Sequence, residues 1–352
     1  MKIIFSLFLL LLGGSIVYSQ SISSVDFGKR KEYMMKTYKI HRLKADKYEQ
    51  QILPSLEREN EQLKNNRISS AKFKEEQKKL YKKYGAMVSQ VFSKGRYKTW
   101  SSCTQELERY HVLSETKLIP LAKMRALHKL ESEWEKRRDS MLTESGDEAK
   151  KLEDSEKMLS NLNAQIRQIL GEENGNWYIA YKEMAFKALD HMDKYGATYN
   201  EGYRIAEIET ACSQKRKKIW EERPENRNEK LQKIEDSKLS AIQNAVPIQV
   251  VEKWKTINNS YLDYVLAKRY GLSKSQVNQF KNAYNVYAIE EYKINNQKKL
   301  SDSEKTEKLK KADDEFCEKV RPLFKNSFYK KWKGKRMHDF KQRMEKKNRK
   351  NI

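Results

Sequence analysis

Few residues of the types that carry out catalysis stand in this sequence at a spacing that would let them act together. The five histidines are scattered, and none has the partner four residues away that a zinc or haem site on a helix needs: His41, His111, His128, His191 and His338. The sequence has neither a glycine-rich phosphate loop nor a nucleophile elbow. Adjacent carboxylates such as Glu290 and Glu291 lie among lysines, which is typical of a salt-bridged helix surface. We therefore expect no catalytic residue, no metal, no cofactor and no enzymatic activity.

The clearest local motif is a helix start near residue 272. Ser273 can accept a hydrogen bond from the amide of Gln276, whose side chain can reach back to the amide of Ser273. Leu272 and Val277 are spaced to form a hydrophobic staple across this cap. The sequence therefore predicts that a helix begins here, with these four residues as its N-terminal cap.

Other segments carry part of the same motif. Thr198 with Glu201 forms the capping box without the staple, and Ser301 with Glu304 opens a further helix in the same way. Ser114 stands at an equivalent position but has no glutamine or glutamate three residues later. The motif thus predicts helix starts at several separate places along the chain.

Four tryptophans recur at a nearly constant interval. Trp100, Trp177, Trp254 and Trp332 are 77, 77 and 78 residues apart. Before each of them, apolar residues stand mostly 20, 16, 12, 9 and 8 positions upstream, which is helical spacing, and Trp177 fits after a deletion of one residue. The pattern predicts four tandem copies of one helical unit, each with its indole in the core. The segments KKYGA, DKYGA and KRYGL recur at unequal spacings and offer a competing register.

Each predicted copy contains a long helix, a polar loop, a second helix, a short break and a helix that carries the tryptophan. We place the copies at residues 20–110, 111–194, 195–269 and 270–352. In the last copy the positions three and seven residues after the tryptophan are Lys335 and Asp339, where the earlier copies are mostly apolar. This loss of apolar surface is expected of a terminal repeat that has no successor.

The composition favours long amphipathic helices that share a thin apolar seam. Charged residues make up 35% of the chain, while glycine and proline number only 12 and 5. Alternation of β-branched residues is almost absent, so we expect an all-α fold made of tandem helical repeats. The net charge of +24 implies attraction to anionic partners, including acidic unfolded proteins, lipid headgroups, polysaccharide and nucleic acid, and does not select among them.

The first residues are typical of a secretory signal peptide. Lys2 precedes an apolar run, and small residues follow toward a cleavage site that we expect near Ser19–Gln20. We therefore predict a signal peptide over residues 1–19, a periplasmic or secreted mature protein, and no transmembrane anchor after cleavage.

The three cysteines, Cys103, Cys212 and Cys317, are odd in number and widely spaced. This spacing favours buried free thiols over a disulfide framework, although one long-range disulfide stays possible in an oxidising compartment.

The motif at Leu272, Ser273 and Gln276 resembles that of the LTxxQ-motif periplasmic proteins, the Spy and CpxP type. Leu113 and Ser114 match its first two positions. The predicted signal peptide, the many lysines and the helical pattern agree with this resemblance. The resemblance implies an ATP-independent periplasmic chaperone or envelope-stress accessory that holds unfolded proteins on a basic, partly apolar face.

Two functions therefore remain as hypotheses. The first is a chaperone-like protein that binds unfolded or acidic client proteins through a basic helical surface. The second is a structural or adhesive envelope protein that binds an anionic polymer such as lipopolysaccharide, cell wall or nucleic acid, with no specific recognition of nucleic acid. The densest basic run, residues 330–350, could bind anionic lipid or nucleic acid, or could form a solvated terminal helix.

Overall fold

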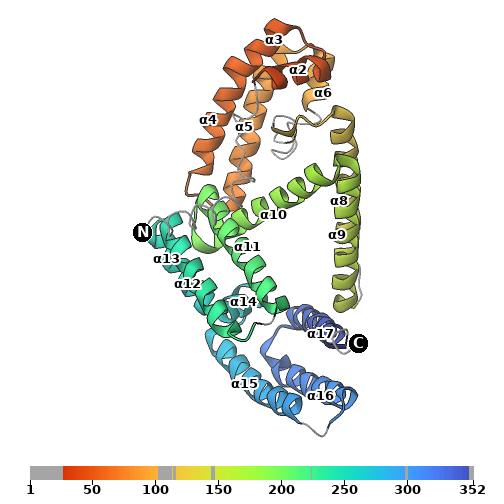
Figure 1. Cartoon of the computed structure of the whole chain (residues 1–352), viewed down its shortest axis with the longest axis vertical. Coiled ribbons are helices and arrows are strands. Elements are labelled where there is room, and N and C mark those ends of the chain that lie inside the picture. Colours follow the sequence, from red (N-terminus) through yellow and green to blue (C-terminus); the bar gives the residue numbers. More distant parts are fainter. Residues whose placement is uncertain are drawn as a thin grey trace. The chain divides into compact units, whose positions relative to one another are not determined.

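The computed structural model describes residues 27–101, 113, 116–143, 147–222, 224–297 and 300–348. Within these ranges all regular structure is helical, and no strand occurs (Figure 1). The all-α class expected from the composition is confirmed. The predicted signal peptide over residues 1–19 with its cleavage site at Ser19–Gln20, as well as Cys103 and Ser114, lies outside the described residues. Of the helices described, none has the length and apolar content needed to cross a membrane.

In chain order the elements are α2 (Phe27–Tyr38), α3 (Arg42–Lys47), the π-helix η3 (Tyr48–Ile52), α4 (Leu53–Lys64), α5 (Ser70–Val91), α6 (Lys94–Trp100), α8 (Leu121–Thr143), α9 (Glu148–Leu170), α10 (Glu172–Tyr195), α11 (Tyr199–Glu222), α12 (Arg227–Ala245), α13 (Ile248–Asn259), α14 (Tyr261–Tyr270), α15 (Lys274–Asn296), α16 (Asp302–Val320), the 3-10 helix η5 (Arg321–Leu323) and α17 (Asn326–Asn348).

The order of long helix, loop, second helix, break and Trp-bearing helix occurs four times along the chain. The Trp-bearing helices are α6, α10, α13 and α17, and the tryptophan is the sixth or seventh residue of each. The break before α10 is the single residue Gly171, whereas the breaks before α6 and α13 contain two residues. The shorter break precedes Trp177, whose sequence pattern fits only after a deletion of one residue. That the four segments are copies of one unit stays a prediction.

The helices gather into two compact units. Unit 1 contains the described residues up to Glu133 together with Leu162–Thr256, and unit 2 contains Trp134–Asn161 together with the described residues from Ile257 onward. Each of α8 and α9 therefore contributes one part to each unit.

The main core of unit 1 lies between α2, α4, α5 and α6, and helices α10 and α11 close one end of it. Figure 1 shows α4 and α5 side by side as one helical hairpin. At the closed end the rings of Phe73 and Tyr199 stack with their centroids 4.9 Å apart. Ala188 and Met192 of α10 belong to the same buried cluster. Helix α5 is thus packed on α10 and α11.

The core of unit 2 is rich in aromatic rings. The indole of Trp332 lies 5.6 Å from the ring of Phe280, 5.9 Å from Phe316 and 5.2 Å from Phe324, measured between centroids. These rings come from α15, α16, the segment after η5, and α17. Aromatic pairs at such distances stabilise a core beyond the apolar area that they bury, so this cluster holds the four elements together.

The connections from α10 to α11 and from α14 to α15 are short and have the same backbone geometry at their first residue. Gly196 and Gly271 end the first helix of each pair in the left-handed region, with φ of 64° and 69°. Only glycine adopts this geometry without strain, so it fixes where each helix ends. Next to the first link, a side chain at Gly202 would place its Cβ 2.6 Å from the carbonyl oxygen of Ala188. Helices α10 and α11 therefore approach closely.

Candidate functional site

The structure contains the predicted cap at the start of α15. The amide of Gln276 donates to the hydroxyl of Ser273 at 3.3 Å, and the amide of Ser273 donates to the side-chain oxygen of Gln276 at 2.8 Å. Leu272 and Val277 are both buried in the core of unit 2. The side-chain amide of Gln276 also donates to the carbonyl oxygen of Leu323 at 2.8 Å. The cap therefore also fastens α15 to η5, a contact that sequence spacing could not reveal.

Two further reciprocal caps occur at the other predicted positions. The amide of Thr198 donates to the carboxylate of Glu201 at 2.9 Å, and the amide of Glu201 donates to the Thr198 hydroxyl at 3.2 Å. Ser301 and Glu304 exchange the same two bonds at the start of α16. These residues start and position helices, and their contacts supply no binding or catalytic group.

Because Gln276 serves both the cap and η5, its loss should cost more than the loss of a cap alone. We expect Gln276→Ala to lower the unfolding free energy of unit 2 by about 1–2 kcal/mol, and Glu304→Ala by about 0.5–1 kcal/mol. Urea denaturation followed by circular dichroism measures both. An equal cost for the two substitutions would show that the bond to Leu323 contributes nothing.

All four repeat tryptophans are buried, although their neighbours differ. Trp100 is fully buried at the end of α6, and the ring of Tyr97 stacks on it with the centroids 6.1 Å apart. The indole of Trp177 has the ammonium of Lys117 4.9 Å from its ring centre. Trp332 packs in the aromatic cluster of unit 2, and the indole of Trp254 donates a hydrogen bond to Glu209. The tryptophans therefore hold structural positions.

The indole of Trp254 belongs to a partly buried polar cluster that joins α10, α11 and α13. Its Nε1 donates to Glu209 at 2.9 Å, and the other oxygen of Glu209 lies 3.3 Å from Nε2 of His191. The Nδ1 atom of His191 lies 2.9 Å from the carbonyl oxygen of Gly202. Burial favours the neutral carboxyl of Glu209, but the hydrogen bonds from His191 and Trp254 and the charge of Lys238 outweigh it, so the pKa of Glu209 lies below its usual value.

The lowered pKa of Glu209 makes the stability of unit 1 depend on pH. Since the folded state holds the ionised form of Glu209, the cluster stabilises unit 1 above the unfolded pKa of about 4.3, and this contribution is lost as the pH falls through the folded pKa. We expect Glu209→Gln to cost about 1–3 kcal/mol at pH 5.5 and much less at pH 3. Urea denaturation of both proteins at the two pH values measures the difference. A difference that does not change with pH would contradict this assignment.

A buried ion pair lies beneath the aromatic cluster of unit 2. The guanidinium of Arg336 lies 2.6 Å from the carboxylate of Asp313, and their side chains are only 15% and 6% exposed. The guanidinium carbon also lies 4.4 Å from the ring centre of Phe316 and 4.7 Å from that of Tyr287. Cation–π contacts and one carboxylate therefore hold this charge inside the unit.

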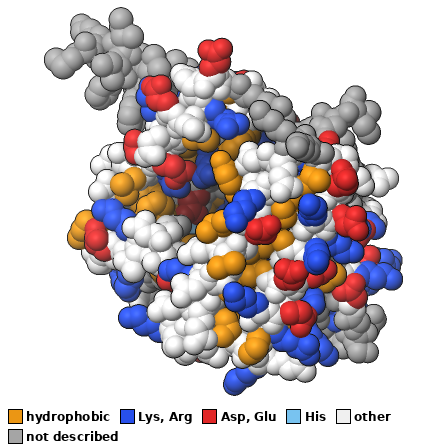
Figure 2. All heavy atoms as spheres, turned by 90° about the horizontal axis from the view of Figure 1, so that it is seen from below, with side chains coloured by type: hydrophobic (Ala, Val, Ile, Leu, Met, Phe, Trp, Pro, Cys, Tyr) orange, Lys and Arg blue, Asp and Glu red, His pale blue; other side chains and the backbone are white. Residues whose placement is uncertain are grey.

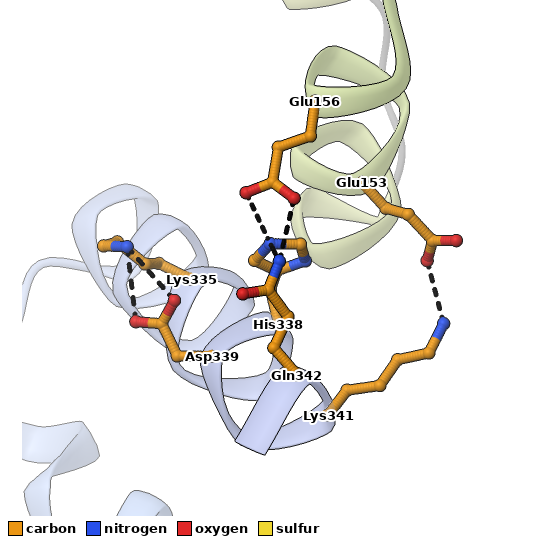
Figure 3. Close-up of polar contacts among 7 residues, drawn as sticks. All are labelled: Glu153, Glu156, Lys335, His338, Asp339, Lys341 and Gln342. Atoms are coloured by element: carbon orange, nitrogen blue, oxygen red, sulfur yellow. Dashed lines mark hydrogen bonds and ion pairs between the residues drawn. The ribbon is translucent and has the colours of Figure 1, made fainter. Parts of the chain in front are cut away.

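The basic C-terminal run forms α17, which is packed within unit 2 rather than fully solvated. Figure 3 shows three side chains of α17 reaching the start of α9: Lys341 lies 2.9 Å from Glu153, while His338 and Gln342 lie 3.0 Å and 2.8 Å from the two oxygens of Glu156. Hydrogen bonds from Lys157 and Lys341 lower the pKa of Glu153 to about 2. Part of the charge of this run is therefore matched within the molecule.

The two positions that distinguish the last Trp helix lie on its exposed side. Lys335 and Asp339 are exposed and form an ion pair with each other at 3.2 Å (Figure 3). Seven residues after Trp177 lies Met184, which is buried, whereas Tyr261, seven residues after Trp254, is 53% exposed. Helix α17 thus carries a charged pair where α10 has a buried apolar side chain.

The described cysteines are free and buried. Burial raises the pKa of the Cys212 thiol, and burial together with the charge of Asp313 raises that of Cys317 to about 11. Both thiols are therefore neutral and unreactive near pH 7. Within the described ranges, no group of three or more histidine, cysteine or acidic side chains is arranged to hold a metal ion.

The strongest candidate for a functional surface is an exposed apolar face of α15. Val286, Ile289 and Tyr292 are 58%, 58% and 71% exposed. We call these three residues the α15 patch. The opposite side of the same helix buries Phe280, Ala283, Tyr287 and Ile294. Helix α15 is thus apolar on both sides, although only one side is packed against its own core.

Large exposed apolar side chains on a charged helical protein mark sites of interaction. Figure 2 shows hydrophobic side chains at the surface, interspersed with those of lysine, arginine, aspartate and glutamate. The composition alone could not separate this patch from the core, because both sides of α15 have helical spacing. The positions of the apolar residues around the helix axis would have shown that α15 is apolar on more than one side.

Comparison of the chain with protein-family models, with curated proteins and with solved structures gives no match.

Proposed function

We propose that this protein is an ATP-independent, chaperone-like or stress-accessory protein of the periplasm or the secreted space. In this proposal it binds unfolded or acidic client proteins through a basic helical surface. The observation that carries the proposal is the α15 patch, an exposed apolar face on a chain of net charge +24. The resemblance of Leu272, Ser273 and Gln276 to the LTxxQ motif adds support.

The proposed mechanism has two steps that the charge and the apolar surface supply separately. Long-range attraction between the basic protein and an acidic client speeds their encounter. Loose contacts between the exposed apolar side chains and those of the client then delay its aggregation. Neither step needs a nucleotide, and release follows when the client buries its own apolar surface by folding.

The test is the aggregation of an acidic client, reduced α-lactalbumin, followed by light scattering at low and high salt. We expect the wild-type protein to suppress aggregation, with a weaker effect at high salt. The double variant Ile289→Asn, Tyr292→Asn should lose most of this suppression. The matched control is Phe186→Asn, since Phe186 is 74% exposed but lies on α10 in unit 1.

An absence of suppression at every salt concentration would remove the chaperone proposal. Binding of the wild-type protein to lipopolysaccharide or cell wall, with the patch variant binding equally well and an unfolded competitor having no effect, would instead favour the envelope-polymer function.

A further inference from the structure

One end of unit 2 is formed by two stretches of the chain that contain no acidic residue. Neither aspartate nor glutamate occurs at positions 264–289 or 319–338 of the sequence. Five exposed cations in these stretches stand at helix ends, and we call them the basic end: Lys268, Arg269, Lys274, Lys319 and Lys325. The stretches are far apart in the sequence, so the structure decides whether their charges add on one surface.

Two contacts bring these stretches together. The side-chain amide of Gln276, in the first turn of α15, donates to the carbonyl oxygen of Leu323 in η5 at 2.8 Å. A Cβ on Gly271, which ends α14, would lie 3.5 Å from the ring of Phe328 in the first turn of α17. The end of α14, the start of α15, η5 with the end of α16, and the start of α17 therefore meet at one end of unit 2.

The carboxylates nearest to the two stretches in sequence are already paired. Asp263 lies 3.1 Å from Lys281, and Glu318 lies 3.5 Å from Arg321. Within the part of the chain that the structure describes, the five cations of the basic end form no ion pair. Their charge is therefore not neutralised within the unit, and it attracts an anionic partner.

An apolar tip lies between cations of the basic end. The 3-10 helix η5 follows Lys319 closely and is followed by Lys325. Within η5, Pro322 is exposed and Leu323 is half-buried. We call these two residues the η5 tip. The basic end therefore offers a small apolar projection as well as positive charge.

We propose that the basic end of unit 2 docks on the surface of a bilayer that contains anionic phospholipids. Its cations contact the lipid phosphates, and the η5 tip enters the boundary between headgroups and acyl chains. A soluble anionic polymer would contact the cations but leave the exposed Pro322 in water. The combination of cations with an apolar tip therefore favours a lipid surface over a polymer.

This inference goes beyond the proposed function, because it uses a different surface. About 18 Å of helix separates Lys274, in the basic end, from Val286, the first residue of the α15 patch. Docking on a bilayer through the basic end thus neither needs the α15 patch nor blocks it.

Co-sedimentation with vesicles measures the docking. The protein used begins at Gln20, so that it lacks the apolar run of the predicted signal peptide. We expect it to bind vesicles of phosphatidylcholine mixed with phosphatidylglycerol, and to bind pure phosphatidylcholine at least about tenfold more weakly. Binding should be lost at about 1 M salt, where the Debye length is about 3 Å. Equal binding to the two kinds of vesicle would overturn the proposal.

A triple variant locates the surface. Lys268→Gln, Lys274→Gln and Lys325→Gln together should weaken binding to the anionic vesicles by at least about tenfold. Because these side chains are exposed and unpaired, the melting curve should match that of the wild-type protein.

The matched control removes the same charge from unit 1. Lys74, Lys78 and Lys82 are exposed on α5, and replacing all three by glutamine should change vesicle binding by less than about twofold. Equal weakening by the two triple variants would show that net charge, and not the basic end, determines binding, and would overturn the proposal.

A third variant separates the lipid surface from a polymer. Pro322→Ser keeps every cation but removes the apolar tip, so it should weaken vesicle binding by about threefold or more and leave binding to heparin unchanged. Binding to heparin that the basic-end variant abolishes, without binding to anionic vesicles, would assign this surface to a polymer and overturn docking on lipid.

Discussion

Replacing Arg336 by alanine is expected to lower the unfolding free energy of unit 2 by about 3–5 kcal/mol. The substitution leaves the carboxylate of Asp313 in the core without the guanidinium that lies 2.6 Å from it. It also removes the cation that contacts the rings of Phe316 and Tyr287. Urea denaturation followed by circular dichroism at 222 nm, fitted with one transition for each unit, gives the change.

The neighbouring ion pair provides the matched control. Lys335 and Asp339 are about half exposed on the same helix, so Lys335→Ala should cost less than about 1 kcal/mol. The double variant Arg336→Met, Asp313→Leu should recover most of the stability, because it removes both charges and keeps the volume filled. If Arg336→Ala costs no more than Lys335→Ala, the buried pair does not stabilise the unit.

Truncation of Trp332 to alanine should also cost about 3–5 kcal/mol. Its indole contacts rings from α15, α16 and the segment after η5, so its loss opens a cavity where these elements meet. The neighbouring rings belong to different helices and cannot close the space without moving the backbone. The same urea experiment measures this change, because circular dichroism does not depend on the fluorescence of the removed indole.

Trp220 is the control for residue type. It is 51% exposed near the end of α11, with the guanidinium of Arg227 over its ring. Trp220→Ala should therefore cost about 1 kcal/mol or less. A similar cost for Trp220 and Trp332 would mean that the indole in the Trp-bearing helix has no special place in the core.

Local sequence patterns were sufficient to predict the helix caps and helices that depend on interactions within a few residues. The capping box at Ser273 and Gln276 depends on spacing within one helical turn, and the structure contains the corresponding bonds. Helical spacing before Trp100 and Trp332 indicated helices that α5 and α16 match. The all-α class followed from the composition for the same reason.

The contacts between distant segments could not be predicted in this way. Glu156 and His338 are 182 residues apart, and no local signal links them. The pairs of Arg336 with Asp313 and of Glu209 with Trp254 likewise depend on how helices pack. The charge of residues 330–350 indicated only a basic helix. The packed side of α17 depends on the contacts of Trp332 with the aromatic cluster and of His338 and Lys341 with carboxylates of α9.

The α15 patch shows the same limit for function. Helical spacing identifies apolar positions but does not say which of them the remaining helices cover. In the structure Ile289 and Tyr292 are exposed, whereas Phe280 and Tyr287 of the same helix are buried. The sequence therefore predicted an amphipathic helix, and only the packing of the helices shows which of its apolar residues reach the surface.

Site-specific photocrosslinking tests most directly whether clients bind at the α15 patch. Benzoylphenylalanine is placed at position 292 in one protein and at position 186 in another, and each is irradiated with reduced α-lactalbumin. The account predicts a crosslinked client at position 292, weaker at high salt, and little at position 186. Equal crosslinking at the two positions, or crosslinking at position 186 alone, would contradict it.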